Sequence, residues 1–124
     1  MRCAALLVTA LSCVAAYPQV PWQAEEFPIA AWGGPPPSHN TLEAYRVFRD
    51  CNFNITGPTG GYDVAGNLKM LDLCEQVGLK AIVVDGRISP DMVQRDDWDE
   101  LVAQIVADYS AHPALYGYYL RDEP

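Results

Sequence analysis

Two adjacent carboxylates, Asp122 and Glu123, stand just ahead of Pro124. They follow an apolar, aromatic run that ends at Leu120 and has the length of a strand. Because a proline disfavours helical backbone in the residue before it, we expect Glu123 to be extended at the carboxyl end of that strand. Parallel α/β proteins carry their chemistry at this edge of the sheet. Glu123 is therefore a candidate proton donor and acceptor, although a solvated strand end or a truncated helix cap is an alternative.

The chain ahead of these acids alternates short apolar runs with helical periods. We expect strands at 27–32, 53–56 and 79–85, helices at about 41–51, 64–77 and 98–109, and a fourth strand in the terminal run. Alternation at this spacing is typical of right-handed βαβ units. A closed barrel of eight units needs about 250 residues. The pattern therefore predicts an α/β fold, the first half of a (β/α)8 TIM barrel, over residues 27–124 in the order β-α-β-α-β-α-β.

Residues 1–16 have the features of a secretory signal. Arg2 gives a basic start, Cys3 to Val14 is an apolar run, and Val14-Ala15-Ala16 offers small residues for cleavage before Tyr17. The run is shorter than the roughly 20 residues of a membrane span. An ordinary buried N-terminal helix is the alternative. We predict a secreted protein without a membrane anchor after cleavage, in which residues 17–26 form an extended lead-in.

The charge balance limits the partners. The net charge is −8, and loss of Arg2 with the signal would make it −9. Such an acidic domain repels phosphate backbones, so we expect no nucleic-acid partner. A neutral substrate is compatible with this charge.

Few residues suggest metal or redox chemistry. Cys51 and Cys74 both fall in helical patterns among apolar neighbours, which favours buried free thiols over a disulfide. The two histidines, His39 and His112, are far apart in sequence, and the chain has no Cys-x-x-Cys. We therefore expect no metal site and no cofactor.

Three stretches together resemble a known family. They are Phe53-Asn54, the strand from Gly78-Leu79-Lys80 to Asp85, and the run from His112 to Tyr118 that leads into Asp122-Glu123-Pro124. They resemble the first half of a clan A glycoside hydrolase barrel, closest to its β-galactosidase-like and glucanase-like members. The resemblance implies that Glu123 is the general acid/base at the end of the fourth strand. It also implies that Asp122 contacts a sugar hydroxyl, where the family usually has asparagine.

The resemblance further implies a retaining mechanism. One carboxylic acid protonates the leaving oxygen, and a second carboxylate about 5 Å away attacks the anomeric carbon. The family's nucleophile lies on a seventh strand, which these 124 residues do not include. We therefore expect the chain itself to be inactive and to represent part of a longer enzyme.

Three further residues are candidates for substrate binding. Trp32 could stack on a sugar ring, with a core tryptophan as the alternative. Asp85 could orient substrate hydroxyls, with a surface ion pair to Arg87 as the alternative. Asn54 could contact substrate, but Asn54-Ile55-Thr56 is also a glycosylation sequon.

These expectations give one main hypothesis and one rival. The main hypothesis is the N-terminal half of a secreted hydrolase that cleaves O-glycosidic bonds in an oligo- or polysaccharide. The rival is a non-catalytic, secreted carbohydrate-binding half-barrel that dimerises to cover its open edge. An unrelated doubly wound domain is also compatible with the element order, but no ligand-binding fingerprint supports it.

Overall fold

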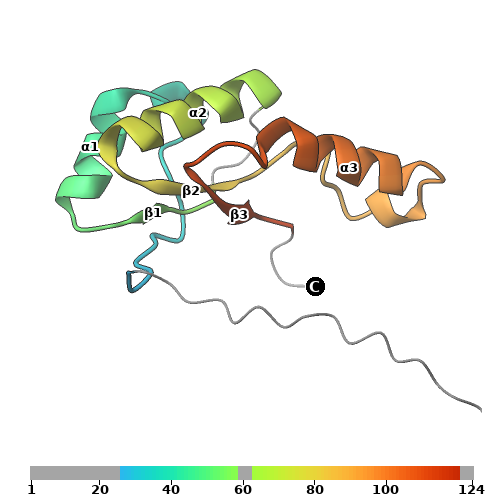
Figure 1. The fold of residues 1–124 in the computed structure, drawn as a ribbon, viewed down its shortest axis with the longest axis horizontal. Helices are drawn as coiled ribbons and strands as arrows, with labels where there is room; N and C mark the ends of the chain where they lie inside the picture. The colour runs from blue at the N-terminus through green and yellow to red at the C-terminus, as the bar shows by residue number, and fades with distance from the viewer. Residues whose placement is uncertain (1–25, 59–62, 121–124) are drawn as a thin grey trace, which may run out of the picture.

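The computed structural model describes residues 26–58 and 63–120. This part of the chain contains the helices α1 (Leu42–Asp50), α2 (Val64–Val77) and α3 (Trp98–Tyr109), the short 3₁₀ turns η1 (Pro37–His39) and η2 (Met92–Gln94), and the strands β1 (Ile55–Thr56), β2 (Lys80–Val83) and β3 (Leu115–Tyr118). The strands are parallel and lie in the order β1-β2-β3. The three helices cover one face of this sheet (Figure 1). We call the other face the open side.

The predicted fold class is wrong. The described residues form a small α/β domain with a three-stranded parallel sheet, not the four-stranded half of a TIM barrel. The segment expected as the first strand, 27–32, contributes a single isolated bridge, between Ala30 and Ile55. Its apolar residues are not buried as those of a central strand would be. Phe27 is 83% exposed and Trp32 is 74% exposed.

A side chain supplements the short backbone pairing along this segment. The Asn54 side chain accepts a hydrogen bond from the Ile29 N–H (2.7 Å) and donates one to the Phe27 carbonyl (2.8 Å). Pro28 has no N–H to give to a ladder. The backbone N–H groups of Asn54 and Ile55 also donate hydrogen bonds to the Ile29 carbonyl (3.1 and 3.2 Å), so these bonds and the Asn54 amide together fix the segment beside β1.

The helix ends follow local sequence signals. Gly78 ends α2 in the left-handed conformation (φ 74°), as expected for a glycine that follows a helix. Asp63 caps the start of α2 by accepting a hydrogen bond from the Gly66 N–H (2.8 Å). Thr41 caps the start of α1 by accepting a hydrogen bond from the Ala44 N–H (3.4 Å). Asn40, just before it, is buried and accepts a hydrogen bond from the Tyr45 hydroxyl (3.0 Å).

The core lies between the sheet and the helices. It consists of apolar and aromatic side chains from all three helices, from β2 and from the residues just before the strands: Tyr45, Met70, Leu71, Cys74, Leu79, Ala81, Val83, Ile105, Tyr109 and Ala114. Both cysteines of the described residues are free thiols. Cys74 is buried as expected, whereas Cys51 is exposed because it lies at the end of α1.

The pairing of β3 with β2 contains an irregularity. Ala81 pairs with Leu115, but its neighbour Ile82 pairs with Gly117, so Tyr116 is an extra residue on β3. Leu115 and Tyr118 both pack against the core. Tyr116 is 43% exposed.

Candidate functional site

Four segments of the chain reach the carboxyl edge of the sheet. Because the strands are parallel, each reaches the same edge at its end. Gly57 follows β1, Asp85 lies two residues after β2, and Tyr119 follows β3. Trp32 lies two residues after the bridge at Ala30, which runs parallel to β1. These segments include two of the residues that sequence analysis singled out, Trp32 and Asp85.

Trp32 and Tyr119 form an aromatic pair on the open side. Their ring centroids are 6.4 Å apart and their planes meet at 85°, an edge-to-face contact. Tyr118 packs on the core, so the next residue of the extended chain, Tyr119, points to the opposite face. Trp32 is 74% exposed, so most of the indole ring is available to a ligand. The aromatic pair is therefore an accessible platform at the carboxyl edge.

Gly57 is needed for this arrangement. A Cβ atom at Gly57 would overlap the carbonyl oxygen of Ala31 and come within 2.8 Å of the Trp32 carbonyl carbon. The Gly34 N–H donates a hydrogen bond to the Pro58 carbonyl (3.4 Å) just beyond. The backbone that carries Trp32 thus lies directly against the end of β1, at a distance that only glycine permits.

Asp85 lies on the helix-covered side and is bound within the protein. It is 3% exposed. Its Oδ1 accepts hydrogen bonds from the backbone N–H and Nε of Arg87 (2.9 and 2.8 Å), and its Oδ2 accepts from an Arg87 terminal nitrogen and from the Tyr109 hydroxyl (2.7 and 2.5 Å). Hydrogen bonding to Arg87, followed by Tyr109, lowers the pKa of Asp85 to about 2.

Neighbouring groups extend this network. The Tyr109 hydroxyl also accepts a hydrogen bond from Asn67 (3.1 Å), and Arg87 pairs with Asp108 (2.7 Å). Burial, followed by hydrogen bonding to Asp85, raises the pKa of Tyr109 to about 12. Of the two alternatives for Asp85, the structure has the ion pair with Arg87. The Asp85 side chain of this pair is buried, whereas that of Arg87 is partly exposed. With four hydrogen bonds already accepted, the Asp85 carboxylate has little capacity left for a substrate hydroxyl.

Asn54 lies at the opposite edge. It directly precedes β1, and its amide binds the 27–29 backbone as described above. Thr56, the third residue of the sequon, is completely buried. The folded chain thus holds Asn54 in a structural contact away from the aromatic pair.

Asp122 and Glu123, the two acids with the strongest sequence signal, lie outside the described residues, as does the predicted signal at 1–16. In the chain they follow Tyr119 by three and four positions. His39 is exposed and contacts the Ser38 hydroxyl (2.9 Å).

Sequence reasoning missed one cluster of possible metal ligands. Ligand atoms of Asp72, Glu75 and His112 lie within 4.8 Å of one another. However, His112 Nδ1 accepts a hydrogen bond from the Ala114 N–H (3.1 Å), so the neutral ring carries its proton on Nε2, which faces Asp72 at 3.2 Å. A metal ion at Nε2 would require the proton on Nδ1, against the Ala114 N–H. The cluster is thus arranged as a hydrogen-bonded link between α2 and the turn before β3.

Comparison of the chain with known proteins finds no relative: no family model, no characterised protein and no solved structure matches it. Within residues 26–58 and 63–120, none of the helices is long and apolar enough to cross a membrane.

Proposed function

We propose that the protein binds carbohydrate at the aromatic pair and hydrolyses O-glycosidic bonds with Glu123 as general acid/base. The exposed Trp32 ring beside Tyr119 is the observation that carries the proposal. Sugar rings present apolar C–H faces that pack on aromatic rings, while their hydroxyls keep hydrogen bonds to polar neighbours and water. The acidic net charge is compatible with such a neutral ligand.

The catalytic part of the proposal depends on the position of Glu123 in the chain. It follows Tyr119, one member of the aromatic pair, by four positions. As a protonated acid it would deliver its proton to the leaving oxygen, and as a carboxylate it would then activate water. The resemblance to clan A glycoside hydrolases assigns the same role to this residue. The predicted signal at 1–16 would direct the protein out of the cell, where polysaccharide substrates occur.

A retaining mechanism needs a second carboxylate, and Asp85 does not fit this role. A nucleophile must approach the anomeric carbon with a free oxygen, whereas both Asp85 oxygens accept hydrogen bonds inside the protein. The proposal therefore requires a nucleophile other than Asp85.

The same observation favours carbohydrate binding without hydrolysis as a second candidate. The aromatic pair is sufficient for binding a sugar ring, and binding needs no second carboxylate. The two candidates differ in whether Glu123 matters for turnover.

Titration with defined oligosaccharides, followed by tryptophan fluorescence and calorimetry, tests both candidates. Trp32→Ala should weaken binding roughly tenfold, because it removes the larger stacking surface. The matched control is Trp98→Ala, which removes an exposed tryptophan at the start of α3. Equal affinity in the wild type and Trp32→Ala would contradict the proposed site.

Release of reducing ends from the same oligosaccharides separates the candidates. If the protein is a hydrolase, Glu123→Gln should lower the rate by about 10²–10⁴ while binding persists. Binding that Trp32→Ala abolishes, with no turnover in the wild type, would support the non-catalytic candidate instead.

A further inference from the structure

Helix α3 carries two apolar stripes, and the core covers only one of them. Leu101, Ile105 and Tyr109, spaced by four residues, pack into the core. Trp98, Val102 and Val106 repeat the same spacing on the neighbouring stripe. Trp98 is 41% exposed and Val106 is 42% exposed. A solvent-facing helix normally has polar residues at such positions, so the second stripe indicates a contact surface.

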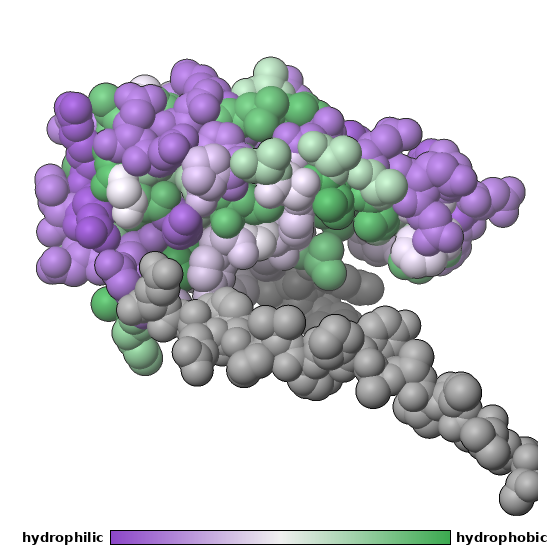
Figure 2. Space-filling model, viewed as in Figure 1, coloured by the Kyte–Doolittle hydropathy of each residue, from purple (hydrophilic) through white to green (hydrophobic). Residues whose placement is uncertain are grey.

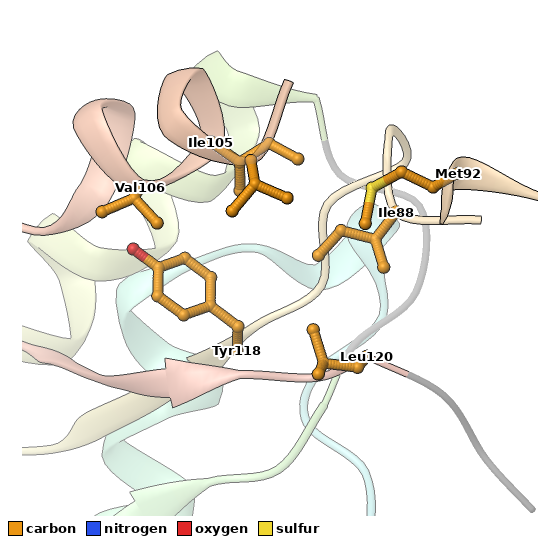
Figure 3. Close-up of a pocket in the computed structure, with 7 residues that line it drawn as sticks. Ile88, Met92, Ile105, Val106, Tyr118 and Leu120 are labelled. Carbon is orange, nitrogen blue, oxygen red and sulfur yellow. The ribbon is translucent and has the colours of Figure 1, made fainter. Parts of the chain in front are cut away.

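Val102 and Val106 of the second stripe belong to one wall of an apolar groove. The groove has a volume of about 100 Å³ and is lined by residues of the β2–η2 loop, η2, α3 and the end of β3: Ile88, Met92, Val102, Ile105, Val106, Tyr118 and Leu120. Figure 3 shows these side chains pointing toward one another, with the Tyr118 ring below Val106. Leu120 is 69% exposed at the rim, and β3 pairs only with β2 in the described part of the chain.

One end of the groove is strongly acidic. The residues that flank η2 and the first turn of α3 contribute exposed acids there: Asp91, Asp96, Asp97, Asp99 and Glu100. The basic residue among them, Arg95, is already paired with Asp97 (2.8 Å). Figure 2 shows hydrophobic residues over α3 and β3 that give way to hydrophilic residues toward the η2 end. The uncompensated negative charge favours an occupant with positive charge next to its apolar side chains.

We propose that this groove docks an amphipathic helix of a partner protein, with an apolar stripe that fits between α3 and Leu120 and with lysine or arginine over the acidic end. The volume of the groove suits one large side chain as an anchor, the usual centre of a helix-in-groove contact. Helices commonly pack through ridges of side chains that are spaced four residues apart, and the second stripe of α3 has this spacing. A second copy of this chain fits less well, because it would bring two acidic ends and two net charges of −8 together.

Fluorescence anisotropy with the full 124-residue protein tests the proposal. The probe is a labelled 15-residue synthetic helix with leucines at positions 4, 8 and 11 and two lysines at each end. Two control peptides are used: one with the same composition but with the leucines spread around the helix, and one with glutamate in place of lysine. We expect saturable binding of the probe and at least tenfold weaker binding of both controls.

Substitutions in the protein locate the binding surface. Val106→Asp should weaken probe binding at least tenfold, because it places a charge in the groove. Val47→Asp, a matched change at an exposed valine of α1, should leave binding unchanged. If circular dichroism shows that Val106→Asp disturbs the helices, Leu120→Asp replaces it as the test variant.

Three results would overturn the proposal: equal binding of the spread-leucine peptide, equal binding of the glutamate peptide, or unchanged probe affinity in a folded groove variant. Sedimentation equilibrium adds a fourth. A dimer that Val106→Asp dissociates would show that the face serves a second copy and not a basic helix.

Discussion

The two sides of the carboxyl edge use their side chains in opposite ways. On the helix-covered side, Asp85, Arg87 and Tyr109 bind one another, and Asp85 is almost fully buried. On the open side, Trp32 and Tyr119 meet edge to face, and Trp32 remains largely exposed. A carboxylate at a strand end is therefore not a functional group by position alone. The face toward which it points decides whether it stabilises the fold or meets a ligand.

The largest expected effect tests the stabilising side. Asp85→Ala should lower the free energy of unfolding by about 3 kcal/mol, because it removes the buried partner of Arg87 and Tyr109. Arg87 keeps its contact with Asp108, which limits the loss. Urea denaturation measures the change. Asp97→Ala, which breaks the solvent-exposed pair with Arg95, is the control and should leave the midpoint unchanged. Equal midpoints for Asp85→Ala and wild type would contradict the stabilising role.

The next prediction concerns pH. The pKa of Asp85 is lowered to about 2 in the folded protein, from 3.8 for an unperturbed aspartate. Its contribution to stability is therefore complete above about pH 4 and is lost as the pH falls toward 2. Denaturation midpoints measured from pH 6 to pH 2 should fall more steeply for the wild type than for Asp85→Asn. Parallel pH profiles of the two proteins would show that the Asp85 carboxylate is not the group responsible.

A smaller effect connects the open side to the backbone beneath it. Gly57→Ala should cost about 1–3 kcal/mol, because the new methyl group forces the Ala31–Trp32 backbone away from β1. The displacement should also change the near-ultraviolet circular dichroism of the aromatic pair. Gly33→Ala is the control, since a Cβ at Gly33 meets nothing within 4 Å. The same stability for both variants would mean that the close approach at Gly57 is not maintained in solution.

The smallest expected effect is on the stability of the Trp32→Ala variant, and it bears on the difference between the two sides of the carboxyl edge. Trp32→Ala should change the free energy of unfolding by less than about 1 kcal/mol, because the ring buries little surface. Together with the loss of sugar binding expected of the same variant, this would separate the functional side of the edge from the stabilising side. A cost of several kcal/mol would instead place Trp32 among the residues that hold the fold together.

The sequence predicted the elements whose signals are local. The end of α2 at Gly78, the span of α3 and the positions of β2 and β3 all agree with the patterns of apolar residues. The prediction of a strand at 27–32 was wrong because its apolar residues resemble those of a buried strand. The segment is instead held beside β1 by the Asn54 side chain and by backbone hydrogen bonds from Asn54 and Ile55 to Ile29. The sequence left two alternatives for Asp85, a substrate contact and an ion pair with Arg87. It could not decide between them, because the partner Tyr109 lies on a different element and no local pattern shows whether a residue at a strand end will face a helix.

The extra residue at Tyr116 has a consequence for how this site can change. In a regular strand, residues 115, 117 and 119 would share one face, and Tyr119 would lie under the helices with Leu115. The bulge shifts this alternation by one position, so Tyr118 takes the place in the core and Tyr119 reaches the side where Trp32 lies. Loss of the single codon for Tyr116 would remove the extra residue and leave a regular ladder, with Tyr118 still in the core and Tyr119 still beside Trp32. The bulge therefore decides which tyrosine reaches the open side, because a regular strand with all of these residues would place Tyr118 there instead.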